Sequence, residues 1–257
     1  MGPRLPTAPR WAWIVIVFCA VAVALALPRI LNTRSATSPA APTTAAPETP
    51  SRSPSPSPED DGVRILVVGD AWTAGTDAGG NGTANWTAVL GGVLKEHDRS
   101  AGVTVAAAVG AGYLQKDPEG RTFADLARGA PGDRPDVVLF FGSESDVATP
   151  AEVRDAAART FAGVRQAWPD AGLRAVGPAW AGDAPPPGLV ADGSAIRQAA
   201  ADAVVPFADP VTDGWFDDAG PSVVAGPGGY PTDAGHRVLA RRIADFLDRT
   251  WGADPGG

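Results

Sequence analysis

Between Val63 and about Trp251, short apolar runs of strand length alternate with longer segments of helical pattern. The runs expected as strands are Arg64–Val68, Gly102–Ala107, Asp136–Phe141, Leu173–Gly177 and Val204–Phe207. The clearest of them, Asp136–Phe141, is continuously apolar after its first residue, as in parallel strands buried on both faces. Strands that alternate with helices over short links predict an open α/β sheet. We therefore expect residues 63–251 to form one domain of three α/β/α layers around a central parallel sheet.

Helices are expected at Asn85–Glu96, Pro150–Trp168, Ser194–Ala203 and from the capping residue Thr232 through Leu247. The second of these has the most complete signals. Thr149 is a suitable cap, Pro150 fits the first turn, and Pro169 ends the helix.

Site residues in such sheets follow the carboxyl ends of the strands. After the first strand the chain reads Gly69-Asp70-Ala71, where the first N–H groups of a helix attract anions. Near its other end it reads Pro231-Thr232-Asp233-Ala234-Gly235-His236. The spacing of Asp233 and His236 allows a carboxylate to orient an imidazole as a general base. A purely structural role, with Asp233 capping the last helix, fits the same spacing.

These two blocks, in this order and spacing, resemble the first and last sequence blocks of the SGNH (GDSL) hydrolases. The resemblance covers residues 63–250 and implies a flavodoxin-like fold. In that family a serine nucleophile follows the Gly-Asp pair, and an Asp-x-x-His supplies the base and its orienter. Here Asp233 and His236 match, but Ala71 stands at the nucleophile position, and a methyl group cannot attack a carbonyl.

The family's middle blocks imply an oxyanion hole. In residues 107–113, Gly110 is the best match for the glycine that donates its N–H, and Gly112 is the alternative. The third block, normally Gly-x-Asn-Asp, corresponds to residues 142–146, and we place Ser145 where the asparagine amide would donate. Losing one such donor typically lowers the rate ~10²–10³-fold. Thr73 and Ser143 are weak candidates for a substitute nucleophile, because a nucleophile must reach its base.

The formal net charge of −8 argues against a nucleic-acid partner, since such proteins usually have a basic face. The single Cys19 lies in the N-terminal apolar run, so the domain has no disulfide and no cysteine metal site. We expect neither a metal nor an organic cofactor.

Residues 1–34 have the pattern of a targeting segment. Arg10 precedes the uncharged run Trp11–Leu27, which is at the short end of the ~17–25 residues that span a membrane. We expect a single-pass anchor through residues 11–27 with the domain outside the cell. The alternative is a cleaved signal peptide, because Ala24-Leu25-Ala26 has the small-x-small form. Residues 35–62, rich in Pro, Ser and Thr, predict a disordered linker, and residues 252–257 a tail.

Five aromatic residues are expected near strand ends, where they form either a platform for sugar rings or the edge of the core: Trp72, Tyr113, Trp180, Trp215 and Tyr230.

The sequence leaves two candidate functions. The favoured one is an exported, catalytically impaired member of the family that binds an acyl or carbohydrate ligand, or a partner, at the cell envelope. The alternative is an active esterase or deacetylase with a rearranged nucleophile. Loss of a triad nucleophile costs about 10⁶-fold in rate, which favours the first.

Overall fold

The computed structural model describes residues 62–182, 184–225 and 229–252. The anchor predicted at residues 11–27, the linker before Gly62 and the tail after Gly252 lie outside the described residues. Among the helices that the structure describes, none combines the length and the apolar character needed to cross a membrane.

A five-stranded parallel sheet forms the centre of the domain, in the order β2-β1-β3-β4-β5. The strands are β1 (Val63–Gly69), β2 (Ala101–Ala107), β3 (Val137–Phe141), β4 (Gly172–Val176) and β5 (Phe207–Ala208). This order, with its switch between β1 and β3, is that of flavodoxin-like sheets. The expected central parallel sheet is thereby confirmed.

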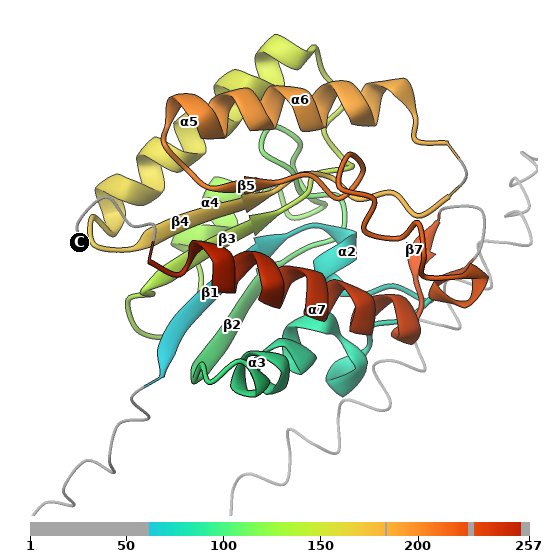
Figure 1. Cartoon of the computed structure of the whole chain (residues 1–257). Coiled ribbons are helices and arrows are strands. Elements are labelled where there is room, and N and C mark those ends of the chain that lie inside the picture. The colour runs from blue at the N-terminus through green and yellow to red at the C-terminus, as the bar shows by residue number, and fades with distance from the viewer. Residues whose placement is uncertain (1–61, 183, 226–228, 253–257) are drawn as a thin grey trace, which may run out of the picture. The chain divides into compact units, whose positions relative to one another are not determined.

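Helices cover both faces of the sheet (Figure 1). The main helices are α3 (Trp86–Glu96), α4 (Phe123–Arg128), α5 (Pro150–Ala167), α6 (Pro187–Asp202) and α7 (Asp233–Thr250). The pair α5 and α6 lies on one face, and the pair α3 and α7 lies on the other. The short helix α2 (Ala71–Ala74) follows β1 directly, and a small hairpin of β6 (Val224–Ala225) and β7 (Tyr230–Pro231) precedes α7.

Alternate residues of β1 enter two separate cores. Leu66 and Val68 pack with α4, α5 and α6, whereas Ile65 and Val67 pack with α3 and α7. A strand with apolar neighbours on both faces needs apolar residues at every position, which explains its continuous apolar run. Both cores lie within the described residues of the domain.

Two expectations need correction, and one helix was not expected. Helix α6 begins at Pro187 rather than Ser194, because Pro is well tolerated in a first turn and glycines within the segment weaken the helical pattern. The fifth strand of the sheet is Phe207–Ala208 rather than Val204–Phe207, since Val204 has a φ of 52° and is 73% exposed in the turn after α6. Helix α4 was not expected, although Thr122 and Asp125 form a capping box at its start.

Candidate functional site at the strand ends

The carboxyl ends of all five strands meet at one edge of the sheet. In the register of the strands, Gly69 is opposite both Ala107 and Phe141, and Val176 is opposite Phe141 and Ala208. The segments that follow the first three strands, residues 70–71, 108–112 and 142–146, therefore emerge together. We call this region the strand-end site.

Asp70 is the N-cap of α2 and connects two of these segments. Its Oδ1 accepts a hydrogen bond from the N–H of Trp72, and its Oδ2 accepts one from the N–H of Glu144, both at 3.0 Å. Burial raises the pKa of Asp70 to about 7, and the charge of Glu144 acts in the same direction. Ala71, at the nucleophile position, is only 2% exposed.

Glu144 is the residue of this site that the sequence analysis missed. Its carboxylate accepts hydrogen bonds from Nε1 of Trp72 at 3.0 Å and from the hydroxyl of Tyr230 at 2.6 Å. A signal was available, because counting Gly-x-Asn from Gly142 places Glu144 at the asparagine position. The structure thus brings a carboxylate, an acceptor, next to the place where the family has an amide donor.

Ser145 stays a prediction for the oxyanion position. The contact that the structure gives it is through its backbone, whose N–H donates to Oγ of Ser143 at 2.8 Å. Of the two glycine candidates, Gly110 lies in the turn after β2 with a φ of 85°. Gly112 lies directly against the carboxylate of Asp146, where a Cβ would overlap its oxygens.

The two weak candidates for a substitute nucleophile are both buried. The hydroxyl of Ser143 donates to the carbonyl of Ala111 at 3.2 Å and accepts from the N–H of Ser145. The hydroxyl of Thr73 lies against the backbone of Gly69, inside the turn between β1 and α2. It has no hydrogen-bond partner in the described part of the chain.

Asp233 and His236 lie in the first turn of α7, as expected, with Thr232 as its N-cap. Their side chains bond to other groups. Oδ1 of Asp233 accepts from the N–H of Gly80 at 2.9 Å, and Nδ1 of His236 accepts from the N–H of Trp86 at 3.3 Å. Among the residues that the structure describes, no hydrogen bond or ion pair joins these two side chains.

The segment between α2 and α3 covers the imidazole of His236, which is 1% exposed. Gly80 has a φ of 77°, and a Cβ at this position would overlap the ring. Burial lowers the pKa of His236 to about 4, although the charge of Asp233 and the backbone at Gly79 act in the opposite direction. The ring is therefore neutral at pH 7, and because Nδ1 is an acceptor, its proton is on Nε2.

The five aromatic residues divide between the two interpretations. Trp72, Tyr113 and Trp215 are buried and belong to the cores. Trp180 and Tyr230 are partly exposed. Trp180 lines a pocket of about 370 Å³ together with three carboxylate residues, Glu144, Asp146 and Asp192. We call this the acidic pocket.

The carboxylates of the acidic pocket have different partners. Asp146 accepts from the backbone N–H groups of Tyr113, Leu114 and Gln115, at 2.8 to 3.0 Å, and so fixes the segment after β2. Burial raises the pKa of Asp192 to about 6, and the charge of Asp146 adds to this effect. In the described part of the chain, no group of three or more His, Cys, Asp or Glu side chains is arranged to hold a metal ion.

Comparison with known proteins identifies the family. No family model matches the chain. The chain is 36% identical over 193 residues to a protein of Mycobacterium tuberculosis described as GDSL lipase Rv0518, a match that covers 71% of this chain and 80% of that protein. The chain belongs to the SGNH/GDSL hydrolase family.

Solved structures of low sequence identity have the same fold. A family two carbohydrate esterase from Clostridium thermocellum, in complex with cellohexaose, matches with a TM-score of 0.58 and 18% identity over 74% of this chain and 65% of its own. Est24, a carbohydrate acetylesterase from Sinorhizobium meliloti, matches with a TM-score of 0.56 and 16% identity over 73% of this chain and 99% of its own.

Proposed function

We propose that this chain is an exported SGNH-type protein whose strand-end site binds a carbohydrate or acyl ligand of the cell envelope without hydrolysing it. The observation that carries the proposal is Ala71 at the position of the nucleophile. The two possible substitute nucleophiles, Thr73 and Ser143, are buried. The hydroxyl of Ser143 is bonded to the carbonyl of Ala111, and that of Thr73 lies against the backbone of Gly69, which supports the absence of hydrolysis.

The arrangement of the base supports the proposal independently. A triad histidine donates from Nδ1 to its carboxylate and receives a proton at Nε2. In this chain Nδ1 of His236 is an acceptor for Trp86, and Gly80 covers the ring. The side chains of Asp233 and His236 thus hold the backbone at Gly80 and Trp86 rather than transfer a proton.

The acidic pocket favours a carbohydrate over a purely acyl ligand. Carboxylates accept hydrogen bonds from hydroxyl groups, and an aromatic side chain offers an apolar face to a sugar ring. Glu144 connects this pocket to the strand-end site through its bonds to Trp72 and Tyr230. The carbohydrate esterases among the structural neighbours support this choice of ligand class.

Ligand binding is tested with the full chain and cellohexaose, by isothermal titration calorimetry. We expect Trp180→Ala to weaken binding about tenfold, near the upper end of what one aromatic contact contributes. Trp251→Ala is the matched control, because Trp251 is also partly exposed but stacks under Arg99 at the end of α7. Absence of binding, or equal losses in both variants, would overturn the carbohydrate assignment.

The second candidate function is an active esterase, favoured by the 36% identity to a protein described as a GDSL lipase. A fluorophosphonate probe separates the two functions, because it reacts with activated serines. We expect no labelling of the full chain. Labelling that disappears in Ser143→Ala would establish the active esterase with a rearranged nucleophile.

The proposed location is the outer side of the cell membrane, with residues 11–27 as a single-pass anchor and residues 35–62 as a linker. Support comes from the sequence pattern alone. Fractionation of cells that express the full chain is expected to place it with the membranes, with a mature N-terminus near Met1. An N-terminus at Leu27 in the soluble fraction would show signal cleavage instead.

A further inference from the structure

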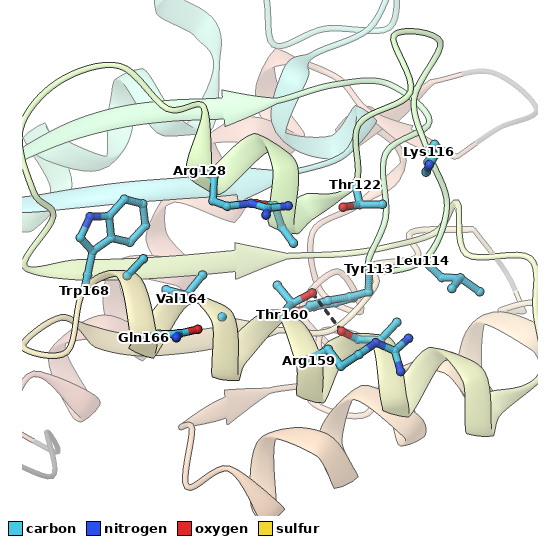
Figure 2. Close-up of a pocket in the computed structure, with 14 residues that line it drawn as sticks. Tyr113, Leu114, Lys116, Thr122, Arg128, Arg159, Thr160, Val164, Gln166 and Trp168 are labelled. Atoms are coloured by element: carbon cyan, nitrogen blue, oxygen red, sulfur yellow. Dashed lines mark hydrogen bonds between the residues drawn. The ribbon is translucent and has the colours of Figure 1, made fainter.

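A second cavity, of about 620 Å³, lies between α4, α5 and the segment that precedes α4 (Figure 2). Its volume is within the ~300–1,000 Å³ of small-molecule sites. Its apolar wall comes from α5, with Ala156, Val164 and Ala167, and Trp168 closes one end. We call it the α4–α5 cavity.

The charged residues that line the α4–α5 cavity are all basic. Lys116 comes from the segment before α4, Arg128 from α4 and Arg159 from α5, and no acidic residue lines the cavity. Arg128 pairs with Asp125 at 2.5 Å, whereas no carboxylate of the described residues forms an ion pair with Lys116 or Arg159. In a chain of formal net charge −8, this local excess of positive charge selects for an anion.

Tyr113 adds an aromatic ring to the lining of the cavity. It lines the cavity, is only 3% exposed, and has a hydroxyl with no hydrogen-bond partner in the described part of the chain. Figure 2 shows its ring between the segment that carries Leu114 and Thr160 of α5. The hydroxyl of Thr160 is already bonded to the carbonyl of Ala156 at 2.9 Å. The hydroxyl of Tyr113 is itself buried. Its ring packs in the core against three phenylalanines, Phe123, Phe140 and Phe161, so Tyr113 adds apolar surface to the lining rather than a polar partner for a ligand.

We propose that the α4–α5 cavity binds a free long-chain fatty acid, with the hydrocarbon chain along the apolar wall of α5 and the carboxylate between Lys116 and Arg159. The apolar wall requires a hydrocarbon, and the basic rim requires an anionic head. A fatty acid supplies both in one small molecule, and it has no positive group to be repelled by the rim.

Gly163 of α5 allows the cavity to be filled without disturbing the fold. It lines the cavity, is exposed, and a Cβ built on it meets no atom within 4 Å. Leucine is also a better helix former than glycine, so Gly163→Leu is expected to fold. Gly92 of α3 is the matched control, because it is also an exposed helical glycine with open space around it and does not line this cavity.

The test uses the full chain and a palmitic acid analogue that carries a photoreactive diazirine, with labelled peptides mapped by mass spectrometry. We expect labels within residues 113–128 and 156–168. Palmitate should compete, and hexadecyltrimethylammonium, which has the same chain and the opposite charge, should not. Gly163→Leu should lower labelling about tenfold or more, since burial of each methylene is worth roughly fourfold in affinity. Gly92→Leu should leave it unchanged.

A separate experiment tests whether the positive charges are needed for binding. Lys116→Gln with Arg159→Gln should weaken competition by palmitate about tenfold, as expected for the loss of charge-assisted hydrogen bonds. Labels confined to residues 11–27, labelling unaffected by Gly163→Leu, or equal competition by the cationic surfactant would each overturn the proposal. These outcomes do not depend on whether the strand-end site binds a carbohydrate.

Discussion

Nδ1 of His236 accepts a hydrogen bond from the backbone N–H of Trp86 at 3.3 Å. Trp86 is the first residue of α3, and its N–H is one of the four that a helix leaves unpaired at its start. The histidine of α7 thus caps the N-terminus of α3, together with Asn85, whose side chain accepts from Thr87. The two helices on this face of the sheet are joined through a residue that the family uses as a base.

Restoring the serine alone is therefore expected to restore no activity. In Ala71→Ser the new hydroxyl would still need a base, and Nδ1 of His236 is bonded to the N–H of Trp86 rather than to a carboxylate. We expect hydrolysis of p-nitrophenyl acetate by the full-length variant to equal that of wild type, with circular dichroism as the control for folding. A rise in rate that disappears when His236→Ala is added would show that the dyad forms in solution.

The ionisation of Asp70 should make the protein less stable as the pH rises. Its pKa is raised from 3.8 to about 7, so the folded state holds a proton that the unfolded state has lost between these values. The stabilising contribution is complete below pH 3.8 and is lost as the pH passes 7. Over this interval, the free energy of unfolding measured with denaturant should decrease by up to about 4 kcal/mol in wild type relative to Asp70→Asn. Parallel curves for the two proteins would contradict the assignment.

His236 should have the opposite pH dependence. Its pKa is lowered from 6.5 to about 4, so the unfolded state binds more protons between these values. The stabilising contribution is complete above pH 6.5 and is lost as the pH falls through 4, a change of roughly 3 kcal/mol. In His236→Gln this rise with pH should be absent, leaving the decrease from Asp70. If the variant instead keeps the wild-type profile, the imidazole is not buried in solution.

The contact between Gly80 and His236 predicts a large loss of stability for Gly80→Ala. The new methyl would overlap the ring, and the φ of 77° strains any residue with a Cβ. We expect a loss of about 3 kcal/mol or more in the free energy of unfolding. Gly82→Ala is the control, since its φ is 58° and nothing lies within 4 Å of the added Cβ, so only about 1 kcal/mol should be lost. Equal losses in the two variants would argue against close packing of this segment on α7.

The sequence was sufficient to predict the sheet and the residues at its edge, because apolar runs and caps are local signals. Thr149 and Thr232 cap their helices as expected. The short strand Phe207–Ala208 was misplaced, because Val204 and Val205 resemble a strand by residue type. Val204 instead lies in the turn after α6 with a positive φ, and the strand begins only at Phe207. Residue type alone does not record a positive φ.

The partners of the site residues were not predictable in the same way. That Nδ1 of His236 bonds to Trp86, and Asp233 to Gly80, depends on the path of residues 75–85, which contain no motif. Glu144 could have been predicted from the sequence, since it is the third residue of the block when the count starts at Gly142. Its bonds to Trp72 and Tyr230 join segments far apart in the chain, and only the fold reveals them.

With Ala71 at the nucleophile position, this member of the family is expected to have no hydrolytic activity of its own. The most direct measurement compares the full-length wild type with His236→Ala on p-nitrophenyl acetate at pH 7, with both preparations shown to be folded. We expect the same rate for both proteins, because His236 takes part in no proton transfer. A wild-type rate clearly above that of His236→Ala would contradict it and establish this chain as a working esterase.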